Sequence, residues 1–234
     1  MNKLIIFDLD GVLLDSEKLY MDMNQKFFKE LGASLSLEEH EKFVGVSATK
    51  MWTYIKEKSD LVQSVEELKQ MERELKFRAL RETDLVPTEG VIKFLDWLKA
   101  RSPTLALASS GMRKNIELIL EKLGLAGYFN LVVSGEEVAR GKPEPDIFLK
   151  VAGYYGRAPA ECVVVEDSGN GVAAAKAAGM ACLGFFNPNS GKQDLSQADL
   201  VFDHFKSPVL YRYFEAVLST MGGNRRRFSR RDVR

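Results

Sequence analysis

The sequence holds few of the residues that mark zinc sites, disulfide scaffolds or membrane spans. Its 234 residues include only two cysteines and two histidines. Cys162 and Cys182 stand inside apolar runs, and no CxxC or Cys/His ligand spacing occurs, so we expect buried reduced thiols and no zinc site. No apolar run approaches the ~18 residues of a membrane span, and acids interrupt the first apolar stretch, which argues against a signal peptide. We therefore expect a cytoplasmic protein.

The sequence also lacks a net charge, because 33 Lys and Arg balance 33 Asp and Glu. The balance is uneven, since the last thirteen residues contain six Arg and one Asp and leave the remainder mildly acidic. An acidic body is not typical of a nucleic-acid binder. The Arg-rich tail, 222–234, is either an arm for an anionic partner or a disordered solvated end. We expect the second, with no nucleic-acid partner, no membrane and a monomeric state.

Short apolar runs rich in β-branched residues alternate with helical patterns along most of the chain. This alternation predicts an α/β fold, a Rossmann-like parallel sheet with helices on both faces. The expected strands are Lys3–Phe7, Thr104–Ala108, Leu131–Val133, Cys162–Val165, Ala181–Phe185 and Leu200–Phe202. The expected helices are Gly90–Arg101, Arg113–Lys122, Asp146–Tyr155, Gly169–Ala178 and Pro208–Ser219.

Residues 16–86 break the alternation, because they are charged, almost free of strand patterns and apolar at helical spacing. We expect an inserted all-α cap domain here, within a discontinuous core domain of residues 1–15 and 87–221. The insertion follows the first strand and therefore lies over its carboxyl end, where open α/β sheets bind ligands. The alternative is a packing module remote from the site.

Two carboxylates, Asp8 and Asp10, follow the first apolar run directly and precede Gly11. Side chains two apart on an extended chain point the same way, and like charges raise each other's pKa unless a cation lies between them. Carboxylate oxygens suit a hard cation such as Mg²⁺, which serves phosphoryl chemistry. A solvated acidic turn is the alternative.

Further polar groups follow other predicted strands. Ser109 and Ser110 come after an apolar run, where a hydroxyl and backbone N–H groups can hold phosphate oxygens. Lys142 stands between a glycine and a proline before a helix, and could neutralise a nucleophile and a phosphate together. Glu166 and Asp167 follow a fourth strand and could complete a metal site. Because the carboxyl ends of parallel strands share one edge, the order of these residues predicts one pocket.

These residues resemble the four motifs of the haloacid dehalogenase-like hydrolase superfamily, and within it the branch that contains β-phosphoglucomutase and phosphoglycolate phosphatase. The motifs occur in order as DLDGVLLDSE at 8–17, Ser109 after LALA, GKPEPDIF at 141–148 and EDSGNG at 166–171. The resemblance runs from residue 3 to about 220. It implies the same α/β core with a mobile helical cap.

The resemblance also implies roles for the motif residues. Asp8 matches the nucleophile that forms an aspartyl-phosphate, and Asp10 matches the general acid/base. Mg²⁺ is held in the family by the nucleophile, the backbone carbonyl of the second Asp and the last acid, here Asp167 with Glu166 close by. The phosphate-binding residues correspond to Ser109, with Ser110 beside it, and Lys142. An acid at position 10 favours phosphate esters, because dehalogenases of the superfamily lack it.

Two positions in the insertion separate the phosphatase and mutase readings. β-Phosphoglucomutases resemble one another in a cap His and a cap Arg, where this chain has Tyr20 and Ala48. An Arg could clamp a second phosphate bidentately, whereas Ala48 cannot. We therefore expect Mg-dependent hydrolysis of a small phosphorylated metabolite, such as a sugar phosphate. The alternatives are a β-phosphoglucomutase-like phosphotransferase and a non-catalytic phosphate-binding protein. Candidate substrate contacts from the insertion are Ser16, Tyr20 and Lys50.

Overall fold

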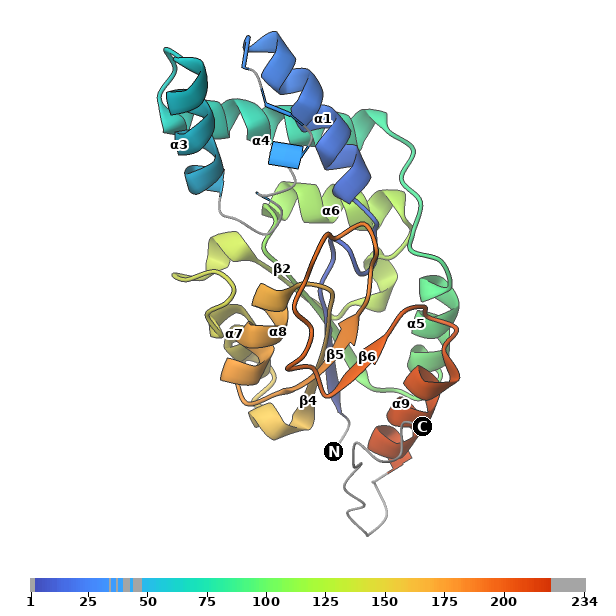
Figure 1. Cartoon of the computed structure of the whole chain (residues 1–234). Helices are drawn as coiled ribbons and strands as arrows, with labels where there is room; N and C mark the ends of the chain where they lie inside the picture. Colours follow the sequence, from blue (N-terminus) through green and yellow to red (C-terminus); the bar gives the residue numbers. More distant parts are fainter. Residues whose placement is uncertain (1–2, 34, 37, 40–42, 44–47, 220–234) are drawn as a thin grey trace.

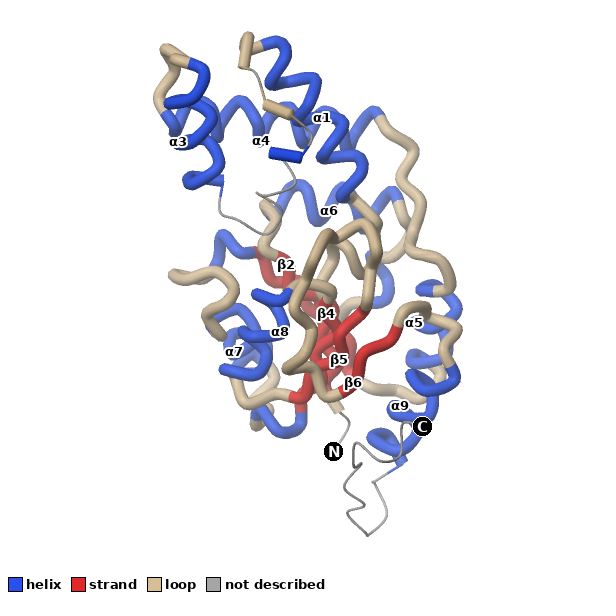
Figure 2. Tube along the Cα trace, viewed as in Figure 1, coloured by secondary structure: helices blue, strands red, loops and turns tan. Residues whose placement is uncertain are grey.

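One parallel sheet forms the centre of the molecule. The computed structural model describes residues 3–33, 35–36, 38–39, 43 and 48–219. Six strands pair in the order β3-β2-β1-β4-β5-β6, and every pair is parallel. Figure 2 shows the strands in red, gathered between helices. The strands are β1 (Leu4–Phe7), β2 (Thr104–Ser109), β3 (Leu131–Ser134), β4 (Cys162–Glu166), β5 (Ala181–Phe185) and β6 (Leu200–Phe202).

Helices cover both faces of this sheet because its central strand is apolar on both sides. Ile5 and Phe7 pack into one buried cluster, whereas Leu4 and Ile6 pack into another, as the two-residue period of a strand requires. The first cluster includes α5 (Val91–Lys99), α6 (Arg113–Lys122) and α9 (Pro208–Ser219). The second includes α7 (Asp146–Tyr154) and α8 (Gly169–Ala177). Single 3₁₀ turns at 126–128, 135–137 and 159–161 complete the connections.

The helices between β1 and α5 form a separate group. They are α1 (Glu17–Glu30), α3 (Ala48–Ser59) and α4 (Val65–Glu82), and Figure 1 shows them together beyond α6 at the top of the molecule. Their shared core surrounds the fully buried Trp52, which meets the rings of Phe27 and Phe28 edge-on at 5.5 and 5.6 Å. We call α1, α3 and α4 the helical insertion.

The predicted fold class is confirmed, and every expected strand and helix of the core is present. Three strands run one residue further than their apolar runs, to Ser109, Ser134 and Glu166. The reason is backbone pairing, since Ser109 pairs with Ser134 and Glu166 pairs with Gly184 although their side chains are polar. The exact domain limits at 15/16 and 86/87 stay a prediction, and the tail at 222–234 lies outside the described residues.

A helix that crosses a membrane must be both long and apolar. No helix in the described part of the chain combines these two properties.

Candidate active site

The central strand delivers Asp8 to the carboxyl edge of the sheet. The Asp8 amide continues the pairing of β1 with β4 by donating to the Val165 carbonyl at 3.0 Å. Because β1 lies between β2 and β4, the Asp8 side chain meets the ends of both neighbouring strands. It is 7% exposed, so its carboxylate has lost nearly all contact with bulk water. A charge in such a place needs a partner.

Lys142 supplies that partner from the loop that precedes α7. Its Nζ donates to Asp8 Oδ1 at 2.5 Å, to Glu166 Oε1 at 2.6 Å and to the Ala108 carbonyl at 3.2 Å. An ammonium carries three protons, and each of these has an acceptor. The side chain is 6% exposed. Lys142 therefore holds the ends of β1, β2 and β4 together through one fixed positive charge.

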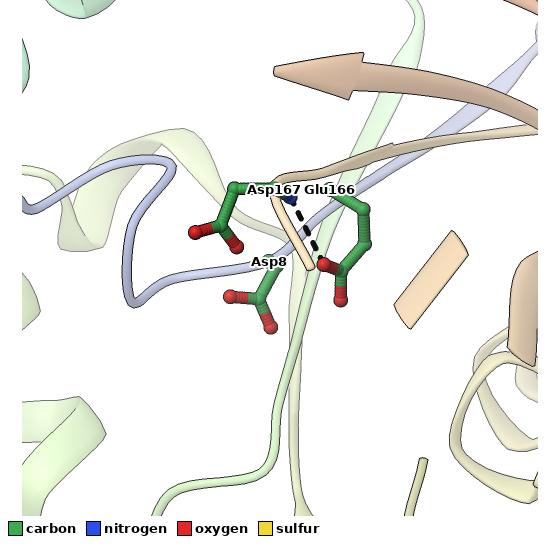
Figure 3. Close-up of side chains that lie close together, drawn as sticks. All are labelled: Asp8, Glu166 and Asp167. Carbon is green, nitrogen blue, oxygen red and sulfur yellow. Dashed lines mark hydrogen bonds between the residues drawn. The ribbon is translucent and has the colours of Figure 1, made fainter. Parts of the chain in front are cut away.

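Two consecutive acids complete the buried cluster. Asp8, Glu166 and Asp167 each offer a carboxylate oxygen, and these oxygens lie within 4.8 Å of one another (Figure 3). Glu166 Oε2 accepts hydrogen bonds of 3.0 Å from the Asp167 amide, the Ser168 amide and the Ser168 hydroxyl. Since Glu166 Oε1 already receives Lys142, we infer that Glu166 chiefly positions Lys142. Asp8 and Asp167 remain the carboxylates best placed to hold a cation.

The cluster contains more negative than positive charge, and the pKa values respond accordingly. Burial raises the pKa of Asp8 well above its usual range, although the Lys142 ammonium opposes the shift. Burial, followed by the charge of Glu166, raises the pKa of Asp167 to about 7. Burial alone lowers the pKa of Lys142, but the carboxylates of Asp8 and Glu166 outweigh it and raise that pKa. Because three acids surround one ammonium, the cluster has an excess of negative charge that a further cation can balance.

Gly11 and Ser190 pack closely against the carboxylate of Asp167. Gly11 has φ of +77°, and a Cβ there would lie 1.9 Å from Asp167 Oδ2, so position 11 requires glycine for both reasons. Asp167 Oδ2 also accepts a 2.5 Å hydrogen bond from the Ser190 hydroxyl. The carboxylate of Asp167 is thereby held in one orientation.

The side chain of Asp10 lies apart from the acidic cluster. Its Oδ1 accepts from the Ser16 hydroxyl at 2.6 Å and from the Tyr20 hydroxyl at 3.1 Å. Ser16 precedes α1 and Tyr20 lies within it, so the helical insertion holds this carboxylate. The Asp10 side chain is not part of the group of three acids. A metal contact through the Asp10 backbone carbonyl, which the family resemblance implies, stays a prediction.

Ser109 and Ser110 lie where β2 ends. Ser109 is buried, and its hydroxyl accepts a hydrogen bond from the Gly111 amide at 3.0 Å. Ser110 is exposed and lines a cavity of about 240 Å³ next to Asp10. The two serines thus differ, since Ser109 is buried and Ser110 is exposed at the cavity.

The same cavity lies between the core and the helical insertion. Its walls include Asp10 and Ser110 from the core, together with Tyr20 from α1 and Ala48 from α3. Lys50, which the sequence suggested as a substrate contact, is exposed on α3, and the cavity-lining residue of that helix is Ala48 instead.

Sequence reasoning missed several residues that the fold brings to this region. Ser190 reaches Asp167, and the Asn187 side chain donates to the Gly11 carbonyl at 3.0 Å. Arg73 and Lys76, both on α4, line the cavity. No local signal marked them, because loop polar residues and helix charges are ordinarily solvated. Only the fold brings them beside motifs elsewhere in the chain, since Ser190 and Asp167 are 23 residues apart and Asn187 and Gly11 are 176 apart.

Comparison with known proteins agrees with this arrangement. A family model of haloacid dehalogenase-like hydrolases matches residues 5–185. A phosphorylated carbohydrates phosphatase from Thermotoga maritima is 35% identical over 75% of this chain and 81% of its own length. A beta-phosphoglucomutase from Bacillus subtilis is 30% identical over 78% of this chain and 82% of its own length.

The fold is likewise found among solved structures. A Thermotoga maritima protein of known crystal structure superposes with a TM-score of 0.74 at 29% identity. The match covers 90% of this chain and 99% of the other.

Proposed function

We propose a function from one premise: the chain belongs to the haloacid dehalogenase-like hydrolase family, and it is a phosphoric monoester hydrolase. The proposal is that it hydrolyses a small phosphomonoester, such as a sugar phosphate, with Mg²⁺ and through an aspartyl-phosphate at Asp8. The observation that carries it is the contact of Lys142 with both Asp8 and Glu166 beside Asp167. A buried ammonium between a nucleophile and a carboxylate pair suits a phosphoryl group.

The donor set fits Mg²⁺. Asp8 and Asp167 offer hard carboxylate oxygens close together, and the cluster of three acids exceeds its single ammonium in charge. Asp8 and Asp167 would hold the ion, with the backbone carbonyl of Asp10 as a third ligand. When bound, Mg²⁺ neutralises charge on the phosphoryl oxygens and on the attacking carboxylate.

The first step transfers the phosphoryl group to the protein. An Asp8 carboxylate oxygen attacks phosphorus while the bond to the leaving oxygen breaks, and Asp10 gives its proton to that oxygen. Lys142 offsets the repulsion between the two anions, and Ser109 hydrogen-bonds a phosphoryl oxygen. The support for this assignment is the burial of Asp8 beside Lys142 and the position of Asp10 on the cavity wall.

The second step releases inorganic phosphate. Asp10, now ionised, takes a proton from a water molecule that attacks phosphorus, and the bond from phosphorus to Asp8 breaks. Asp8 is regenerated as a carboxylate, and Asp10 again carries the proton for the next cycle. Residues 16–86 act as the cap in this proposal, because Tyr20 and Ala48 close the cavity above Asp10 and limit access of bulk water.

Phosphoglucomutase activity is the second candidate, since a curated mutase matches most of the chain. The β-phosphoglucomutases that this chain resembles carry an Arg in the insertion that can clamp a second phosphate bidentately. The residue of α3 that lines this cavity is Ala48, which cannot replace that Arg, and the cations of the wall, Arg73 and Lys76, lie on α4 instead. This observation favours hydrolysis.

The test is a phosphate-release screen over sugar phosphates, phosphoglycolate, nucleotides and cofactor phosphates, with and without Mg²⁺. We expect release from a subset of the panel, dependent on Mg²⁺ and lowered by about 10⁴-fold in Asp8→Asn. Asp22→Asn, on the exposed surface of α1, is the matched control and should keep full activity. Undiminished release in Asp8→Asn contradicts the mechanism. Conversion of β-glucose 1-phosphate to the 6-phosphate with little phosphate lost favours the mutase, and phosphate-analogue binding without turnover favours a binding protein.

A further inference from the structure

The cavity next to Asp10 carries a feature that the proposed chemistry does not use. Arg73, on the face of α4 that lines this cavity, is half-buried. No carboxylate of the described residues lies within ion-pair distance of its guanidinium. A guanidinium presents a planar set of donors suited to a carboxylate or a phosphate. It lines the same cavity as Asp10, which the proposed function places beside the leaving oxygen, so it can reach the part of a substrate that leaves.

The other charged groups of the wall already have partners. Asp10 Oδ1 receives the hydroxyls of Ser16 and Tyr20, and Glu72 Oε2 receives the Trp52 indole N–H at 2.6 Å. The Lys76 ammonium lies 3.5 Å from the centroid of the Tyr20 ring. Of these charged wall residues, Arg73 is therefore the one left for a ligand.

The size and polarity of the cavity restrict the rest of the leaving group. A volume of about 240 Å³ corresponds to roughly eight water molecules at ~30 Å³ each, which suits a short chain or a single sugar ring. Asn115, on the α6 wall, is 5% exposed, and its Oδ1 has no hydrogen-bond partner among the described residues. A buried acceptor without a donor calls for a ligand hydroxyl.

From these observations we infer that Arg73 is a specificity-determining residue, and that the preferred substrate is a small hydroxylated phosphomonoester bearing a second anionic group. Arg73 binds that group, and Asn115 accepts a hydrogen bond from a hydroxyl. This inference rests on the proposed function, because it takes the phosphoryl group to lie at Asp8 and the leaving group to lie in the cavity. Ala48, across the cavity, leaves room for the group that Arg73 binds.

The experiment measures binding in Asp8→Asn protein with Mg²⁺, so that no turnover complicates the result. Two matched pairs are compared by calorimetry: erythrose 4-phosphate with 4-phosphoerythronate, and ribose 5-phosphate with ribose 1,5-bisphosphate. The first pair tests a carboxylate and the second tests a phosphate. We expect the member with the second anionic group to bind ~10- to 100-fold more tightly in at least one pair, the range of a charge-assisted hydrogen-bonded pair.

Variants of α4 decide whether Arg73 is responsible. Arg73→Gln should remove the preference while leaving affinity for the neutral-tailed compounds unchanged. Arg78→Gln, an exposed position on the same helix, should keep the preference. Equal affinity within both pairs in the parent protein overturns the inference, as does an equal loss for both members of a pair in Arg73→Gln. Failure of the proposed function shows separately, as undiminished phosphate release by Asp8→Asn.

Discussion

The carboxyl edge of the sheet and the helical insertion handle charge in different ways. At the sheet edge, Asp8, Lys142 and Glu166 are almost fully buried, and each makes short hydrogen bonds to the others or to backbone groups. In the insertion, Arg73 and Lys76 stay partly exposed and line a cavity. The sheet edge is therefore preorganised, and we expect substitutions there to lower stability and activity. We expect the cavity wall above it to tolerate substitutions better.

The difference separates two tasks. Chemistry that acts on a phosphoryl group needs charges held in one geometry, and the ends of three paired strands provide it. Selection of the leaving group needs only a surface with suitable charge and size, and helices built around their own small core can provide it. We expect mutations at the edge to lower turnover and mutations in the insertion to alter substrate choice.

The largest effect should follow from removing the ammonium at the sheet edge. Lys142→Met leaves three buried carboxylates without their cation, so turnover should fall by about 10³-fold. The free energy of unfolding of the metal-free protein should fall by about 3–5 kcal/mol. Lys150→Met, which removes the partly exposed pair with Glu137, should cost under ~1 kcal/mol. Urea denaturation measures the free energy of unfolding, and steady-state assays measure turnover. Comparable losses in Lys142→Met and Lys150→Met would contradict the difference between buried and exposed charges.

A glycine-to-alanine substitution should disturb the same sheet edge to a smaller extent. A Cβ at Gly171 would lie 1.9 Å from the Glu166 carboxylate, so Gly171→Ala should displace Glu166 from Lys142 and lower turnover by about 10²-fold. At Gly153, on α7, nothing lies within 4 Å of an added Cβ, so Gly153→Ala should stabilise the protein by about 0.5 kcal/mol. Thermal unfolding and turnover are compared for the pair. Full activity in Gly171→Ala removes Glu166 from the argument.

A change inside the insertion should affect binding and spare the chemistry. Trp52→Phe keeps most of the buried ring but removes the indole N–H that holds Glu72 on the cavity wall. We expect a loss of about 1–2 kcal/mol in stability and a several-fold rise in KM with kcat nearly unchanged. Tyr54→Phe, on the more exposed face of α3, is the control. A fall in kcat without a change in KM means that the insertion does more than select.

The smallest predicted effect is that of pH on the stability of the folded, metal-free protein. Burial, then Glu166, raises the pKa of Asp167 to about 7, against ~3.9 in an unfolded chain. Between these values the folded, metal-free protein binds more protons than the unfolded chain, so this group lowers stability as pH rises from about 4 to about 7. The affinity for Mg²⁺ should rise over the same interval. Denaturation with a chelator should show the slope in the parent protein and a weaker slope in Asp167→Asn.

Much of the sheet edge could be predicted from the sequence because each residue follows an apolar run directly. Asp8 after LIIF, Ser109 after LALA and Glu166 after CVVV sit at strand ends, and parallel strands bring such ends to one edge. Lys142 was identified by its place between a glycine and a proline, but its three acceptors came only with the structure. The sequence suggested Glu166 as a metal ligand. It could not show the hydrogen bonds that join Glu166 to Lys142 and to the residues just before α8.

The insertion was predicted as helical, but the use of its side chains was not. Helical periodicity identifies which residues are apolar and cannot say which polar ones meet another segment. Tyr20 was noted because it stands where the β-phosphoglucomutases carry a cap His, and it does reach Asp10. Lys50 was proposed on similar grounds and is exposed, while Arg73 and Lys76 on α4 were passed over.

The sequence alone determined the strand and helix order, the parallel sheet and the set of groups at its edge, because these depend on local periodicity and on the geometry of parallel strands. The tertiary structure decided how those groups pair and what lies above them. Hydrogen bonds between residues 8 and 142, or 167 and 190, and a cavity between α4 and α6, depend on chain segments packing at distances that no local pattern encodes.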